Sequence, residues 1–153
     1  MSTAGGSGSD RTSCIFCTKS EETADEQNLI LHRAELNFVL LNLYPYTSGH
    51  LMIAPYAHVA SLEEADEETV SEMMLLTRKS QSILRSVYRA PGYNAGMNIG
   101  ACAGAGIAGH IHMHVLPRWP GDVNFMTTIS ETRVIPEATE ETYHKLHAAF
   151  QMS

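Results

Sequence analysis

Three histidines alternate with apolar residues in the run GHIHMHVLPRW at positions 109–119. His110, His112 and His114 occupy every second position, which is the period of a β-strand. One strand face would therefore present three imidazoles, while the apolar residues between them face a core. Three neighbouring rings need polar partners when they are buried, and this is a poor way to stabilise a sheet. We interpret the cluster as a site of chemistry.

Two kinds of chemistry fit such a cluster. A metal site would use neutral imidazoles as ligands, whereas a nucleophilic site would use one ring to attack phosphorus and the others to stabilise phosphoryl oxygens. The Gly/Ala-rich loop at 100–109 favours the second interpretation, because its backbone N–H groups can approach an anion closely. His50, which begins another strand-like segment, is a fourth candidate histidine.

Cys14 and Cys17 form a CxxC pair near the N-terminus. Such a pair can be redox-active, part of a structural metal site or a coincidence. No thioredoxin-like context follows it, which disfavours a redox role. A structural zinc site needs four ligands, and His58 is a candidate for the third.

The composition limits the function classes. The 153 residues suit one soluble domain, with 44% hydrophobic and 18% charged residues. A net charge of -7 argues against general binding of nucleic acid, although a local site can still take a small anion. We expect no membrane span and no secretory signal. The odd count of three cysteines favours a reducing cytoplasm over a disulfide scaffold.

The pattern along the chain predicts an α+β fold with a mainly antiparallel sheet, one long helix and one C-terminal helix. Residues 1–12 are small and polar and are expected to form a flexible tail. A capping-box pattern at Ser61–Glu64 precedes the long helix. The elements that we expect are two short strands within 29–43, strands at 50–54, 93–98 and 110–115, and helices at about 66–88 and 136–151.

The motif His-φ-His-φ-His-φ-φ, in which φ is apolar, is matched in full at 110–116. The chain resembles the histidine triad (HIT) family of nucleotide hydrolases and transferases over roughly 14–150, which implies a single HIT-like domain at 13–153. The block PRWPGDVNFM at 117–126 is similar to the branch that contains diadenosine tetraphosphate phosphorylases and Fhit-like dinucleoside polyphosphate hydrolases. Other blocks that support the resemblance lie at 42–50, 55–59 and 98–100.

The resemblance implies a double displacement on adenosine-containing dinucleoside polyphosphates. His112 would be the nucleophile at the α-phosphorus, His114 would contact the phosphate, and His50 would complete the catalytic cluster. Water or phosphate would then attack the nucleotidyl-histidine. The residues expected to bind the nucleotide are Asn42 at the ribose and, at the phosphates, Asn98, Gly104, Ala105 and Gly106.

The resemblance also implies a structural zinc site and a homodimer with a continuous sheet. Zinc-bearing members of the family are similar in having a CxxC pair, a later histidine and the first triad histidine. The expected ligands are therefore Cys14, Cys17, His58 and His110.

One position departs from the family pattern. Family hydrolases place a polar side chain four positions before the first triad histidine, where this chain has Gly106, followed by Ile107. This leaves phosphorolysis and phosphoramidate hydrolysis open as alternatives. A catalytically weak nucleotide-binding interaction module is a further alternative.

Overall fold

The computed structural model describes residues 11–42, 48–122 and 138–153. The N-terminal tail up to residue 10 lies outside the described residues, as do positions 123–126 of the branch-specific block and the expected helix start at 136–137. Among the described residues, no helix is both long and apolar enough to span a membrane.

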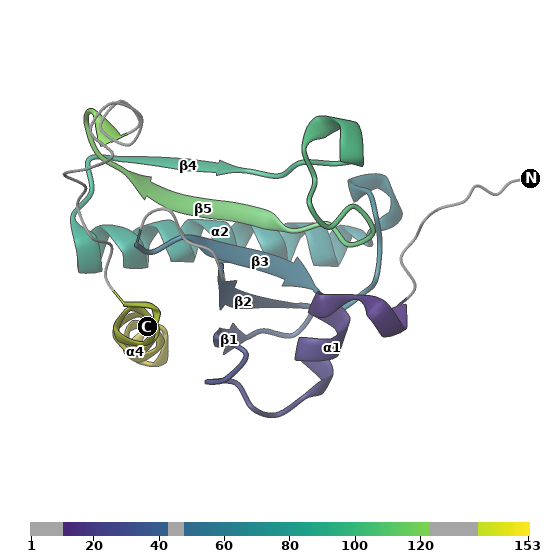
Figure 1. Cartoon of the computed structure of the whole chain (residues 1–153), viewed down its shortest axis with the longest axis horizontal. Coiled ribbons are helices and arrows are strands. Elements are labelled where there is room, and N and C mark those ends of the chain that lie inside the picture. Colours follow the sequence, from purple (N-terminus) through teal and green to yellow (C-terminus); the bar gives the residue numbers. More distant parts are fainter. Residues whose placement is uncertain (1–10, 43–47, 123–137) are drawn as a thin grey trace, which may run out of the picture.

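An antiparallel sheet of five strands forms the centre of the molecule (Figure 1). The strand order is β1-β2-β3-β5-β4, and every neighbouring pair is antiparallel. This arrangement confirms the expected α+β fold with its antiparallel sheet. The strands are β1 (Ile30–Arg33), β2 (Asn37–Leu41), β3 (Leu51–Pro55), β4 (Gly92–Gly96) and β5 (Met113–Arg118).

Strand β2 shows why the sheet has a core on each face. All five of its residues are buried. Val39 and Leu41 belong to the larger core, which includes residues of the long helix α2 (Glu67–Tyr88). Phe38 and Leu40 belong to a second core, which includes residues of the short helix α1 (Ile15–Glu21). Alternation along an extended strand therefore sends successive side chains to two different helices.

The helices cover the sheet through apolar faces. In α2, Met73, Leu76 and Leu84 are buried in the larger core, as the helical spacing of the sequence predicts. Helix α4 (Thr139–Met152) adds Leu146 and Phe150 to the same core. Each of these large apolar side chains contributes about 1.5–3 kcal/mol when fully buried.

Three local predictions need correction. Ser61 does not cap the long helix, because residues 62–64 form a separate 3-10 turn and α2 starts at Glu67. Two of the residues assigned to the flexible tail, Arg11 and Thr12, belong to a 3-10 turn (Arg11–Ser13), and the Arg11 guanidinium pairs with Glu21 at 3.0 Å. The regular hydrogen bonding of β5 starts only at Met113, so the first two triad histidines precede the strand.

Candidate active site

The triad histidines share one face of the chain even though only the third lies within β5. Ile111 and Val115 are buried in the core beneath α2, and the histidines that alternate with them turn to the opposite face, toward α1. The Ile111 N–H donates to the Val59 carbonyl at 2.9 Å, which fixes the extended segment ahead of the strand. The period of two therefore predicted the orientation correctly.

His112 is held in one tautomer with a free nitrogen lone pair. Its Nδ1 lies 3.0 Å from the backbone oxygen of His110. A carbonyl oxygen can only accept, so Nδ1 must hold a proton, and in the neutral ring Nε2 is then unprotonated. Burial lowers the pKa of the His112 imidazole, which favours this neutral form. An uncharged ring with a lone pair on Nε2 is the state that a nucleophile requires.

A chain of hydrogen bonds orients His114 in a similar way. The Asn42 amide nitrogen lies 3.1 Å from His50 Nδ1, and His50 Nε2 lies 2.9 Å from His114 Nδ1. Because the amide nitrogen donates, His50 must hold its proton on Nε2 and donate it to His114. His114 then holds its own proton on Nε2, where it can donate to an anion.

The backbone brings these three side chains together. Asn42 follows β2 and His50 precedes β3, and the Asn42 N–H donates to the His50 carbonyl at 3.0 Å. Strand β3 pairs with β5 so that Met52 lies opposite His114. The two histidines are thus brought together by the pairing of two strands that are distant in sequence.

A cavity of about 320 Å³ opens beside the histidines. This volume lies at the lower end of the range of small-molecule sites. All five residues predicted to bind the nucleotide line it, together with two of the three predicted catalytic histidines, and they are Asn42, Asn98, Gly104, Ala105, Gly106, His112 and His114. His50 is not among the lining residues and contacts the site through His114.

The loop between β4 and the triad contributes backbone to this cavity. Gly104 has a φ of +99°, which side-chain-bearing residues rarely adopt, and a Cβ there would lie 3.6 Å from Asn98 Nδ2. Gly106 has open space around its Cα, with no heavy atom within 4 Å of an added Cβ. The cavity wall is therefore mostly backbone at this side.

The opposite wall was not predicted from the sequence. It includes Ile15, Phe16, Lys19, Leu40, Leu41 and Met52, whereas Ile107 lines the cavity next to Gly106 in the loop. Lys19 is half-buried and donates to the Asn28 carbonyl at 3.4 Å, and burial lowers the pKa of its ammonium group. The CxxC pair could have predicted Ile15 and Phe16 as lining residues, because residues between two cysteines that share one site must lie near that site.

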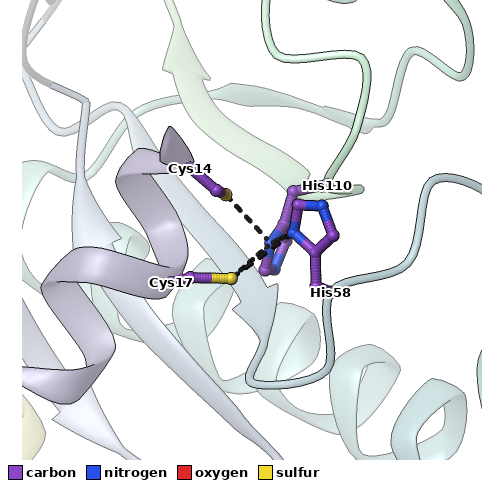
Figure 2. A group of neighbouring side chains, drawn as sticks. All are labelled: Cys14, Cys17, His58 and His110. Carbon is purple, nitrogen blue, oxygen red and sulfur yellow. Dashed lines mark hydrogen bonds between the residues drawn. The ribbon is translucent and has the colours of Figure 1, made fainter. Parts of the chain in front are cut away.

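A second cluster lies beside the first triad histidine, and Figure 2 shows its four side chains converging from α1 and two loops. His110 Nδ1 lies 3.3 Å from Cys14 Sγ, 3.6 Å from Cys17 Sγ and 3.3 Å from His58 Nδ1. The four potential ligand atoms all lie within 4.8 Å of one another. The structure therefore brings together all four residues predicted to bind zinc.

The cluster fits a tetrahedral metal ion. Zinc bonds of ordinary length place neighbouring nitrogen and sulfur ligands about 3.3–3.6 Å apart, which matches the distances from His110. His110 Nε2 donates to the Pro55 carbonyl at 2.8 Å, so its Nδ1 presents a lone pair to the cluster. Burial raises the pKa of the Cys17 thiol to about 11, and a bound cation would offset this by stabilising the thiolate.

Comparison with known proteins agrees with this arrangement. The model of the HIT domain family matches residues 23–121, which include the triad. The chain belongs to the HIT family.

Curated HIT relatives include two enzymes by name. The chain is 42% identical over 125 residues to the AP-4-A phosphorylase of Mycobacterium tuberculosis, covering 82% of this chain and 64% of that protein. It is 27% identical over 92 residues to the bis(5'-adenosyl)-triphosphatase of Dictyostelium discoideum, covering 60% and 61%. The chain thus spans less than two thirds of the length of these relatives.

A solved HIT structure is similar over nearly the whole chain. It is a Zn-bound histidine triad family protein from Mycobacterium smegmatis, with 26% identity and a TM-score of 0.72. The match covers 94% of this chain and 96% of that one. The fold therefore has a counterpart in a HIT protein described as Zn-bound.

Proposed function

We propose that this chain cleaves adenosine-containing dinucleoside polyphosphates, such as diadenosine tetraphosphate, by transferring the nucleotidyl group to His112. The names of the two curated relatives support this substrate class. The main support is the hydrogen bond from His112 Nδ1 to the His110 carbonyl, because it leaves the lone pair of the neutral ring on Nε2, and His112 lines the cavity.

The reaction proceeds in two displacements. In the first, the Nε2 lone pair of His112 attacks the α-phosphorus, a P–N bond forms, and the bond from phosphorus to the bridging oxygen breaks. The leaving polyphosphate keeps that electron pair. In the second, an oxygen of phosphate or water attacks the same phosphorus and the P–N bond electrons return to Nε2. His114 Nε2–H donates to a phosphoryl oxygen and stabilises the charge that develops there.

We further propose that Cys14, Cys17, His58 and His110 hold a structural zinc ion. Four protein ligands leave no open position, so the metal would supply rigidity and no Lewis-acid chemistry. The Zn-bound structural relative supports this choice of metal.

We also propose that the chain forms a homodimer through the edge strand β4. This strand is the last in the sheet, and its residues Asn94–Gly96 are exposed. Its outer edge pairs with no other strand among the described residues, and such an edge would suit a sheet that continues into a second copy. A monomeric mass by light scattering in solution would contradict this.

A product assay tests the reaction. Diadenosine tetraphosphate is incubated with and without inorganic phosphate, since phosphorolysis yields ATP plus ADP and hydrolysis at the α-phosphorus yields ATP plus AMP. We expect His112→Ala to lower turnover by about a thousand-fold or more while AMP binding and the melting temperature persist. Unchanged turnover in this variant would contradict the proposal. Cleavage confined to an adenosine phosphoramidate would instead identify the chain as a phosphoramidate hydrolase.

A second function is favoured by one observation. Gly106 and Ile107 line the cavity where family hydrolases have a polar side chain, so one contact to the phosphates or leaving group is missing. The chain could then bind nucleotides as an interaction module with little catalysis. Tight AMP binding without turnover of any polyphosphate would support this second function over the first.

A further inference from the structure

Phe16 contacts both histidine sites at once. Its ring centroid lies 4.8 Å from that of His112 and 5.2 Å from that of His110, with tilts of 42° and 46°. The side chain is only 1% exposed and lies at the wall of the nucleotide cavity. Phe16 therefore packs against His112, the ring proposed to attack phosphorus, and against His110. His110 belongs to the four residues proposed to hold zinc, here termed the metal cluster (Cys14, Cys17, His58 and His110).

Helix α1 presents Phe16 from a position between two potential metal ligands. Cys14 is the residue before the first turn and Cys17 lies within the helix, so both flank Phe16 in sequence. The helix has seven residues, which is too short for an isolated helix to be stable in water. Its position therefore depends on its contacts with the rest of the chain, and the cysteine thiols point into the cluster (Figure 2).

We infer that Phe16 is a positioning residue through which the metal cluster orients the imidazole of His112. The cluster fixes α1, α1 holds Phe16 against the His112 ring, and the ring keeps its Nδ1–H directed at the His110 carbonyl. This inference rests on the proposed role of His112 as nucleophile.

The physical reason is the freedom of the imidazole about its side-chain torsions. One hydrogen bond at Nδ1 fixes a point of the ring, and rotation is stopped only by atoms packed against its face. Phe16 supplies one such contact and His114, whose ring centroid lies 4.8 Å away, supplies another. Because His114 is itself held by His50, Phe16 is the contact that responds to the metal cluster.

A matched pair of substitutions tests the inference. Phe16→Leu removes the aromatic contact to His112. Phe38→Leu makes the same change in the same buried core, where Phe38 is 0% exposed and packs edge-on against Phe16. Phe38 is not among the residues that line the cavity. Metal content and melting temperature are measured for both variants, so that the general cost of a smaller core residue is known.

The decisive readout is the NMR signal of the His112 ring nitrogens, recorded without nucleotide at one neutral pH. We expect one tautomer in the wild type and in Phe38→Leu, and averaged or broadened signals in Phe16→Leu. Removing the metal by chelation should broaden the same signals in the wild type. Equal spectra in the two variants would overturn the inference. A His112 signal that changes neither in Phe16→Leu nor on metal removal would also overturn it.

Kinetics separates positioning from simple binding. With diadenosine tetraphosphate, Phe16→Leu should lower kcat by about 10- to 100-fold, and Phe38→Leu should lower it by much less. A change confined to KM would overturn the inference, because Phe16 would then act only as a wall of the cavity. A wild type that fails to turn over the dinucleotide contradicts the proposed function, while the NMR comparison still decides the role of Phe16.

Discussion

His50 Nε2 donates a hydrogen bond to His114 Nδ1 across 2.9 Å, and His50 itself does not line the cavity. The direction of this bond follows from the Asn42 amide, which donates to His50 Nδ1. His50 therefore contacts the cavity through His114, and it fixes which nitrogen of His114 carries the proton. This relationship separates the roles of two histidines that the sequence alone placed in one catalytic cluster.

The first prediction concerns this hydrogen-bond chain. His50→Ala should lower kcat by about 10- to 100-fold with little change in KM, because it disturbs the His114 tautomer but removes no side chain that lines the cavity. Asn42→Ala should also raise KM, since Asn42 lines the cavity as well as orienting His50. Steady-state kinetics of both variants on diadenosine tetraphosphate checks this. A larger effect of His50→Ala on KM than on kcat would contradict the chain.

The second prediction concerns stability against pH. Burial, followed by the nearby charges of His114 and His112, lowers the pKa of His50 from 6.5 to about 4. As the pH falls from about 6.5 to 4, His50 therefore becomes protonated in the unfolded chain but stays neutral in the folded chain. The free energy of unfolding should decrease over this interval, and His50 should contribute nothing to the slope above it.

Urea denaturation across that pH interval measures the effect. His50→Gln removes the titrating group, so its free energy of unfolding should fall less steeply than that of the wild type. Any loss of metal at low pH affects both proteins, so the difference between the two slopes reports His50. Identical slopes would show that His50 titrates alike in the folded and unfolded states.

The third prediction concerns the metal. Protein purified without added metal should contain close to one zinc per chain, and Cys17→Ser should lose it and melt at a lower temperature, because the three remaining ligands would lose their shared cation. Cys102→Ser is the matched control, since Cys102 is exposed and lies outside the cluster. Elemental analysis that finds well under one zinc per chain in the wild type would count against the site.

The sequence predicted the strand faces and the ligand set but not the wall of the cavity. Strict alternation was enough to place Ile111 and Val115 in the core and the histidines opposite them, because successive side chains of an extended chain point to opposite faces. The metal ligands were found through the family resemblance, since spacing alone cannot bring Cys14 to His110 across 96 positions.

Long-range pairing and docking bring together residues that local sequence patterns cannot place side by side. The contact between His50 and His114 depends on the register that sets Met52 opposite His114, and register is a property of two strands together. Phe16 and Lys19 became wall residues only because α1 docks against the sheet. Ser61 matched a capping box, yet its hydroxyl donates to the Glu63 carboxylate beside a short 3-10 turn. The same local sequence pattern therefore formed a 3-10 turn and not the start of the long helix.

The fourth prediction concerns the choice between water and phosphate as acceptor. Gly106 lines the cavity, has no positive φ, and leaves open space where a Cβ would lie, so a side chain can be added without strain. Gly106→Gln would supply a polar group of the kind found at this position in family hydrolases. We expect it to increase cleavage in the absence of phosphate by about tenfold, because one well-placed hydrogen bond to a developing charge is worth about that much or more.

The matched control is Gly106→Ala, which adds the Cβ without a polar group. If the glutamine acts through its amide, the ratio of AMP to ADP formed in the presence of phosphate should rise in Gly106→Gln and stay at the wild-type value in Gly106→Ala. An equal rise in both variants would mean that bulk at the cavity wall excludes phosphate. No change in either would mean that residue 106 does not select the acceptor, and that the selection is made elsewhere in the cavity.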